Sequence, residues 1–417
     1  MQQLYLTNCR VIDLIEDECS PFPATVIIQE GRISAIDRTS PSPPDGTRTI
    51  DLSGAYLLPG LWDVHCHPGA LMPDASRATL FETEAERTLR AVRNTRAALR
   101  VGITALRALG EPNFIDVALR ETYANRQPTG LWKKGYDDKR LIGPRMFCAG
   151  PAIRTTGGHG AKGRVESVYT PIALEADGPY EIMKTARYCI KMGVDWIKLA
   201  ITGGISGTRE SMYESQMTYE EIKAACDVAH NKGLKVTAHA GGAEAVKTGV
   251  RAGLDCIEHG YQLDEEACEL MAASGVFYCP TLMVTRDEEY MRRWEWPEKS
   301  VQRALAGAEA HRRAFETALQ AGVKIVKGTD AGPIADTAIS EIEWLVEAGM
   351  SPTQALVAST RHAAELCDVA DSLGTVKEGK LADLIAVERN PLEDITALRQ
   401  VKLVMKEGEI VSGQLAR

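Results

Sequence analysis

The middle of the chain alternates short apolar runs with longer stretches whose apolar residues recur every three to four positions. The short runs have the length and composition of buried strands, and the longer stretches have the spacing of amphipathic helices. The helical pattern is clearest at 86–102 and 219–233. Eight strand-like runs occur, at 55–65, 102–109, 145–153, 194–204, 234–241, 254–260, 276–282 and 323–332.

Strands that alternate with helices favour a parallel sheet, and eight such units can close into a barrel. We therefore expect an α/β fold in which residues 58–367 form a (β/α)8 TIM barrel. The two ends differ, because short strands and turns follow one another over residues 1–57 and again over 368–417. We expect these segments to form together one small β-sandwich domain that flanks the barrel.

Side chains that can bind a metal lie at the C-terminal ends of these runs, where a barrel assembles its site. His65 and His67 are two residues apart, so both can point to the same side of a strand and reach one ion. Imidazole together with carboxylate suits zinc or a similar divalent ion. The full set, in chain order, is His65, His67, Lys198, His239, His259 and Asp330.

Each member of this set also has an ordinary structural interpretation. A single histidine at a strand end, such as His239 or His259, often makes only a hydrogen bond. Lys198 lies between Ile197 and Leu199, where a charged amine is costly to bury unless it is neutralised, paired or modified. A lysine that reaches solvent or forms an ion pair is the alternative. Because six ligand-type residues follow barrel order, a metal site is the leading hypothesis.

The ordered set and its surroundings resemble the amidohydrolase superfamily over nearly the whole chain. The resemblance runs from LLPGLWDVHCH through DWIKLAITGG, VTAHAGG, CIEHG and KGTDAG to GTVKEGKLADLIAVERNPLEDI. Within the superfamily the chain is similar to the imidazolonepropionase-like group. That group includes metal-dependent prolidase-like dipeptidases and carboxypeptidases, together with ochratoxin and phenylurea hydrolases.

Similarity to the binuclear branch implies a cofactor of two divalent ions, with zinc expected. It implies that Lys198 is carboxylated by CO2 and bridges the ions. His65, His67 and Asp330 would bind one ion, and His239 and His259 the other.

The expected reaction is hydrolysis of an amide bond by a hydroxide that bridges the two ions. Asp330 would take the proton of the hydroxide and pass it to the leaving amine, with ligation alone as the alternative. The leading substrate class is a dipeptide or an N-acyl amino acid, as for a prolidase or a carboxypeptidase. Hydrolysis of a cyclic amide, urea, carbamate or lactone is the alternative, and a non-catalytic barrel stabilised by metal is a third possibility.

Loop residues provide candidates for substrate binding. His159 in RTTGGHGAKG is expected to donate a hydrogen bond to a substrate carbonyl or carboxylate, and a solvent-facing turn histidine is the alternative. Arg154, Arg209 and Tyr213 lie on flanking loops and could hold a terminal carboxylate, although most loop arginines are only solvated. The tryptophan pair in RRWEWPEK could cap the pocket or form an oligomer contact, and both interpretations stay open.

Composition limits the classes of binding partner that we expect. A net charge of −9 disfavours nucleic-acid and anionic-membrane surfaces, and the ten cysteines lack CxxC pairs, as expected of reduced thiols in the cytosol. We expect no signal peptide and no membrane span, because the start lacks the required pattern and no apolar run approaches ~20 residues. The prediction is a cytoplasmic homo-oligomer that acts on a small molecule and binds neither nucleic acid nor membrane.

Overall fold

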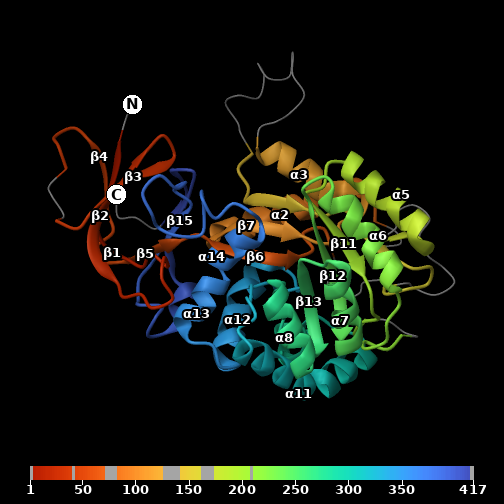
Figure 1. Cartoon of the computed structure of the whole chain (residues 1–417). Coiled ribbons are helices and arrows are strands. Elements are labelled where there is room, and N and C mark those ends of the chain that lie inside the picture. The colour runs from red at the N-terminus through yellow and green to blue at the C-terminus, as the bar shows by residue number, and fades with distance from the viewer. Residues whose placement is uncertain are drawn as a thin grey trace, which may run out of the picture.

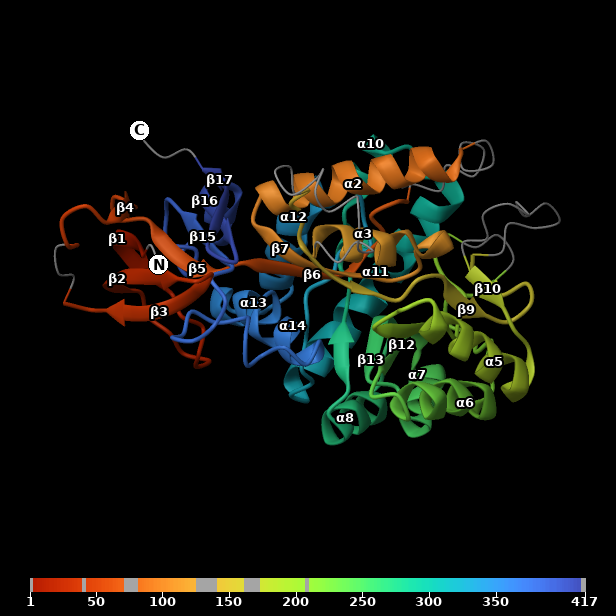
Figure 2. The ribbon, with the colours of Figure 1, turned by 90° about the horizontal axis from the view of Figure 1, so that it is seen from above.

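The computed structural model describes residues 3–39, 43–70, 82–124, 141–160, 173–206 and 210–413. Over these ranges the fold is mixed α/β, and the strands form sheets of eight, six and three strands. Figures 1 and 2 show both chain ends gathered on one side of the molecule, with the remaining strands and most helices on the other.

The eight-stranded sheet is built from both ends of the chain, which confirms the strands predicted there. Its order is β17-β16-β15-β5-β1-β2-β3, and β4 also pairs with β1. The sheet forks at β1, whose first half pairs with β4 and whose second half pairs with β5. The strands are β1 Leu4–Val11, β2 Phe22–Gln29, β3 Arg32–Asp37, β4 Arg48–Asp51, β5 Tyr56–Pro59, β15 Leu384–Val387, β16 Val401–Lys406 and β17 Glu409–Gly413.

The chain passes from this sheet to the central strands at Gly60. The predicted run 55–65 is divided there into β5 and β6 (Leu61–Cys66), which belong to different sheets. A Cβ at Gly60 would lie 2.2 Å from Oγ1 of Thr104, so only glycine fits this close approach. In Figure 2, β6 leads from the terminal sheet into the rest of the molecule.

The two central sheets are parallel. The three-stranded sheet has the order β6-β7-β8, and the six-stranded sheet has the order β10-β9-β11-β12-β13-β14. The remaining strands are β7 Ile103–Ala108, β8 Arg145–Cys148, β9 Ala152–Arg154, β10 Ala173–Glu175, β11 Trp196–Ala200, β12 Lys235–Gly242, β13 Cys256–Gln262 and β14 Phe277–Cys279.

Two of the predicted strands are wrong in detail. The run 145–153 is two strands, β8 and β9, in different sheets, because Gly150 turns the chain with a φ of +63°. The run 323–332 is not a regular strand, and only Ile325 makes a bridge, to Tyr278.

The 323–330 segment nevertheless joins the two central sheets through its backbone. On one side Val326 N donates to Tyr278 O at 2.9 Å, and on the other Val64 N donates to Lys327 O at 3.0 Å. Elsewhere, Asp195 N donates to the carbonyl of Cys148 in β8 at 2.7 Å. These bonds link strands that belong to separate sheets.

Helices follow the central strands, as the 3.6-residue spacing predicted. The predicted helices appear as α2 (Glu84–Arg100) and α6 (Tyr219–His230), and each begins with a capping box. Within the described residues, no helix combines the length and apolarity needed to cross a bilayer. The other helices are η1 Pro112–Phe114, α3 Ile115–Tyr123, α5 Gly178–Lys191, α7 Ala243–Ala252, α8 Glu265–Ser274, α9 Met283–Arg286, α10 Glu288–Arg293, α11 Glu298–Gln320, α12 Ile334–Glu347, α13 Pro352–Ala358, α14 Arg361–Leu366 and η2 Ile395–Arg399.

Candidate metal centre

The ends of β6 and of the 323–330 segment bring two histidines to one carboxylate. His67 Nε2 lies 2.9 Å from Asp330 Oδ1, and His65 Nε2 lies 3.6 Å from the same oxygen. Burial would raise the pKa of Asp330, but His65 and His67 hold it below its usual value. The Asp330 carboxylate is therefore kept ionised, as a ligand or a proton acceptor needs to be.

The histidines of β12 and β13 complete the cluster. The ring centroids of His239 and His259 are 4.4 Å apart, and those of His65 and His259 are 4.9 Å apart. Possible ligand atoms of His65, His259 and Asp330 all lie within 4.8 Å of one another, a spacing that one divalent ion can span.

Each of three histidines has one ring nitrogen engaged by a neighbour. His65 Nδ1 lies 2.8 Å from a carboxylate oxygen of Glu258, and His259 Nδ1 lies 2.7 Å from the hydroxyl of Thr281. His239 Nε2 donates to the carbonyl of Gly203 at 2.9 Å. A partner on one nitrogen fixes the orientation of the ring and leaves the other nitrogen for an ion.

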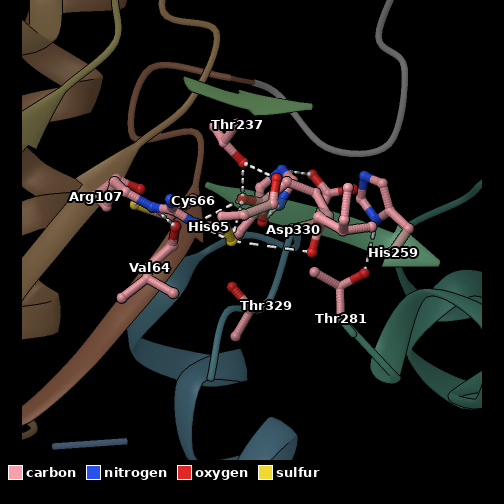
Figure 3. A network of polar contacts seen from close by, with 12 residues as sticks. Val64, His65, Cys66, Arg107, Thr237, His259, Thr281, Thr329 and Asp330 are labelled. Carbon is pink, nitrogen blue, oxygen red and sulfur yellow. Dashed lines mark hydrogen bonds and ion pairs between the residues drawn. The ribbon is translucent and has the colours of Figure 1, made fainter. Parts of the chain in front are cut away.

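Glu258 connects this histidine cluster to the buried Arg107. Figure 3 shows Arg107 and His65 in the same network of polar contacts. One oxygen of Glu258 faces His65, and the other accepts from Arg107 Nη2 at 2.6 Å and from the hydroxyl of Thr237. Burial would raise the pKa of Glu258, but Arg107 and His65 hold it well below its usual range. The side chains of Arg107 and Glu258 are both fully buried, so the pair is a fixed ionic support behind His65.

Lys198 lies in β11 with its amine inside the site. Nζ has no hydrogen-bond partner among the described residues, and the residue is only 5% exposed. The neighbours of Lys198 in the strand, Ile197 and Leu199, pack into the main hydrophobic core, which also contains buried residues of the surrounding helices. Burial lowers the pKa of Lys198. A buried amine without a partner matches a group that is neutralised or modified, and with the imidazoles and the carboxylate it fits a site for divalent ions.

The backbone is strained at the ends of three strands or segments that form the site. His259, Thr281 and Asp330 have φ angles of 75°, 50° and 49°, in the left-handed region that such residues rarely adopt. Conformations of this kind cost about 1–3 kcal/mol each and persist where the surroundings impose them.

Asp63 helps to impose the conformation of the segment that ends in Asp330. Its carboxylate accepts from Lys327 Nζ at 2.9 Å and from both the backbone and the hydroxyl of Thr329, at 3.1 and 2.9 Å. Gly328 lies between these two donors, and a Cβ there would come within 2.6 Å of His65. The result is a close, fully buried junction between β6 and the segment that ends in Asp330.

His159 and the loop residues around it lie next to the histidine cluster. The ring of His159 stacks on that of His239 with centroids 4.0 Å apart. Arg154 is 1% exposed, and it donates to the carbonyl of His159 and pairs with Glu175 at 3.3 Å. Its described contacts therefore support the loop, and its direct contact with substrate stays a prediction. Tyr213 is partly buried, and Arg209 lies outside the described residues.

An apolar wall adjoins the same loops. Tyr261 stacks on His259 with centroids 5.1 Å apart and belongs to a cluster with residues from the β11 loop and from α10 and α11. The two tryptophans of RRWEWPEK, Trp294 and Trp296, are partly buried and pack against this cluster. They contribute to the wall near the candidate site, and an oligomer contact stays a prediction.

Glu258 and Thr281 were not singled out from the sequence. The signal for Glu258 was available, since it lies between Ile257 and His259 in a buried strand, where an acidic residue is as unusual as Lys198. Thr281 carries no comparable signal, because a threonine at a strand end is ordinary.

Comparison with known proteins identifies the family. The chain matches the amidohydrolase family over residues 56–411, which include all six candidate ligands. The chain belongs to this family. The membership supports an enzyme that hydrolyses C–N bonds, as the amidohydrolase name implies.

Individual amidohydrolases cover nearly all of the chain. Ochratoxinase from Aspergillus niger is 30% identical in a match of 386 residues, and the match covers 86% of this chain and 76% of that protein. A Xaa-Pro dipeptidase crystallised with methionine in its active site superposes with a TM-score of 0.87 at 32% identity, covering 98% of this chain and 99% of the other. A prolidase in complex with N-methylphosphonate-L-proline has a TM-score of 0.87 at 28% identity, covering 99% and 100%.

Proposed function

We propose that this amidohydrolase is a binuclear metallohydrolase that removes the C-terminal residue of a dipeptide or an N-acyl amino acid. The proposal rests chiefly on one observation: the amine of Lys198 is buried without a described partner, and its charge acts on His65, His259 and Asp330, whose possible ligand atoms lie within 4.8 Å of one another. A purely structural metal site would not need such a lysine or an open position for water.

The assignment of ligands follows what the resemblance to the binuclear branch of the family implies. His65, His67 and Asp330 would hold one ion, His239 and His259 the second, and Lys198 as a carbamate would bridge them. Two divalent ions, with zinc expected, supply a lowered pKa for a bound water molecule and polarisation of the scissile carbonyl.

The side chains carry the remaining steps. Asp330 accepts a proton from the attacking water and delivers it to the leaving nitrogen, because an amide nitrogen leaves readily only when it is protonated. Arg107 and Glu258 keep His65 in one orientation throughout. His159 contacts the substrate carbonyl or its carboxylate, and the apolar wall beside Tyr261 excludes water from the reacting groups.

The substrate class is supported by the named relatives. The Xaa-Pro dipeptidase is named for a dipeptide substrate and holds methionine in its active site, and the prolidase is in complex with N-methylphosphonate-L-proline; both cover nearly the full chain. For this chain we infer from these ligands a substrate whose released residue bears a free carboxylate. Arg154, Arg209 and Tyr213 are the candidates for binding that carboxylate. The cyclic amide, urea, carbamate and lactone alternatives use the same site and differ only in the pocket.

We also propose a domain organisation for this site. The eight central segments would form the strands of a (β/α)8 barrel over residues 58–367. Residues 1–57 and 368–417 would form the flanking β-sandwich. The backbone bonds from the 323–330 segment to β6 and to Tyr278 support closure at that seam. Cytoplasmic location and homo-oligomer formation stay predictions.

The proposal is tested with protein produced in the presence of zinc and bicarbonate. A panel of dipeptides and N-acyl amino acids is assayed beside a smaller set of lactones, ureas and cyclic amides. We expect turnover of amides with a free carboxylate. Turnover restricted to the second set would replace the proposed substrate class, and no turnover of either set would argue against a hydrolase of this kind.

Asp330→Asn provides the matching variant. We expect it to fold normally and to lose turnover by at least about a thousandfold, because the amide cannot shuttle the proton. Asp336→Asn, an exposed position at the start of α12, is the control and should keep full activity. Retained activity in Asp330→Asn would refute the shuttle role.

A further inference from the structure

His159 is held by a different side chain at each of three polar groups. Its backbone N–H donates to Gln216 Oε1 at 2.9 Å, and its carbonyl accepts from Arg154 Nη1 at 3.2 Å. Its ring Nδ1 lies 2.9 Å from Glu210 Oε1, while the ring face rests on His239. Among the described residues, no hydrogen bond engages the ring Nε2, which is left for a ligand.

The proton positions in this network follow from the backbone donor. An N–H can only donate, so the Gln216 atom that faces His159 is the amide oxygen, and the NH2 of Gln216 points to Glu210 Oε2 at 3.2 Å. An ionised carboxylate can only accept. Its other oxygen, Oε1, must therefore accept a hydrogen bond from His159, and the proton of that bond resides on Nδ1.

Glu210 has the burial and charge that this assignment requires. Its side chain is 8% exposed. Burial would raise its pKa, but the hydrogen bond and charge of His159 hold the pKa below the usual value. The loop that carries Glu210 is anchored upstream, where Arg303 donates to the carbonyls of Gly204 and Ile205 at 3.0 and 3.1 Å.

We propose that Glu210 is a positioning residue for His159: it keeps a proton on Nδ1 and turns the Nε2 edge of the ring toward the substrate, where a ring that also carries a proton on Nε2 donates to a carbonyl or carboxylate oxygen. The inference rests on the proposed function, in which His159 contacts the substrate. Glu210 acts through His159 and does not itself touch the reacting atoms.

A carboxylate is required at this position. An amide in its place would turn an NH2 group toward either the His159 N–H or the Gln216 NH2, and a donor facing a donor breaks the network. Glu210→Gln therefore changes the hydrogen-bond pattern with almost no change in shape. Glu214→Gln is the matched control, since Glu214 is exposed on the same loop and the variant loses the same charge.

The first measurement reads the ring directly and needs no substrate. Zinc-loaded protein labelled with 15N-histidine is studied by long-range 1H–15N correlation, with His159→Phe used to assign the His159 signals. We expect a protonated Nδ1 at His159 in the wild type and in Glu214→Gln, and loss of that pattern in Glu210→Gln. A wild-type ring with its proton on Nε2 and a bare Nδ1 would overturn the proposal.

The second measurement is kinetic, on the amide that the substrate panel shows to be turned over fastest. Glu210→Gln should lower kcat/KM by about 10–100-fold at unchanged metal content, as is typical when a group that orients a site residue is lost. In the His159→Phe background the same change should alter kcat/KM by less than about twofold, because coupled residues are not additive. An equal loss in both backgrounds would overturn the proposal.

Failure of the proposed function gives a different pattern. If no amide is turned over, the reaction assignment falls, and the 15N spectrum alone decides whether Glu210 fixes the ring of His159.

Discussion

The candidate site has two sides, which are held by different means. The strand-borne side consists of the six candidate ligands, and the loop-borne side consists of His159 and the loop residues around it. On the strand-borne side, the Arg107–Glu258 pair and the Lys327–Asp63 pair are fully buried, and each supports a candidate ligand. On the loop-borne side, His159 is partly exposed and is held by side chains of neighbouring loops. The side expected to bind ions is built into the sheet ends, where geometry is hard to change, and the side expected to bind substrate can vary with its loops.

Removing the buried charge of Glu258 is the strongest way to break the strand-borne side. Glu258→Gln should lower metal affinity by about 10–100-fold and the free energy of unfolding by about 3–5 kcal/mol, because Arg107 is left without its counter-charge and the single amide oxygen can face Arg107 or His65 but not both. Zinc titration and urea unfolding measure the two effects.

The matched control for this variant is Glu269→Gln, an exposed position on α8. It should change neither quantity. If Glu258→Gln binds zinc as tightly as the wild type, the strand-borne side does not depend on this ionic support.

The pH dependence of stability at Glu341 tests the same strand-borne side. Its buried carboxyl accepts from the backbone N–H groups of Leu282 and Met283, next to Thr281, and burial raises its pKa to about 8. Because the folded pKa lies above the unfolded value of about 4.5, the stability contributed by Glu341 is complete below that value. It is lost as the pH rises through about 8.

The measurement is the melting temperature between about pH 5 and pH 9. The wild type should lose several degrees over this range, and Glu341→Gln should remove that part of the loss, since a neutral amide does not titrate. Glu347→Gln, exposed on the same helix, should keep the wild-type slope. Identical slopes in the wild type and Glu341→Gln would mean that the carboxyl does not titrate in this range.

Substitution of Tyr213 should give the smallest effect on the kinetics, and it tests the loop-borne side. Tyr213→Phe removes one hydroxyl from a partly buried loop residue, so we expect KM to rise by about 2–10-fold with little change in kcat. Tyr219→Phe, at a 41% exposed tyrosine, is the control. A fall in kcat at constant KM would instead assign Tyr213 to the chemical step.

The sequence predicted the strand-borne side well because its signals are local. The alternation of His65 and His67, and a lysine between Ile197 and Leu199, can be recognised without knowing the fold. Strand ends could also be ordered along the chain, although Gly150 and the irregular 323–330 segment were not foreseen, since their hydrogen bonds depend on which strands become neighbours.

The sequence could not predict the loop-borne contacts for a different reason. Glu210 and Gln216 look like ordinary polar loop residues, and only the fold brings them to His159, more than fifty positions earlier in the chain. Substrate binding by Arg154 stays a prediction, but its burial and its bond to the carbonyl of His159 depend on the fold and cannot be seen in composition.

The metal content of the chain tests the central claim most directly. Protein produced with zinc and 13C-bicarbonate should contain about two ions per chain and show a carbamate carbon signal, and Lys198→Ala should lose the signal and retain at most about one ion. A wild-type chain that binds a single ion and shows no carbamate signal would contradict the account.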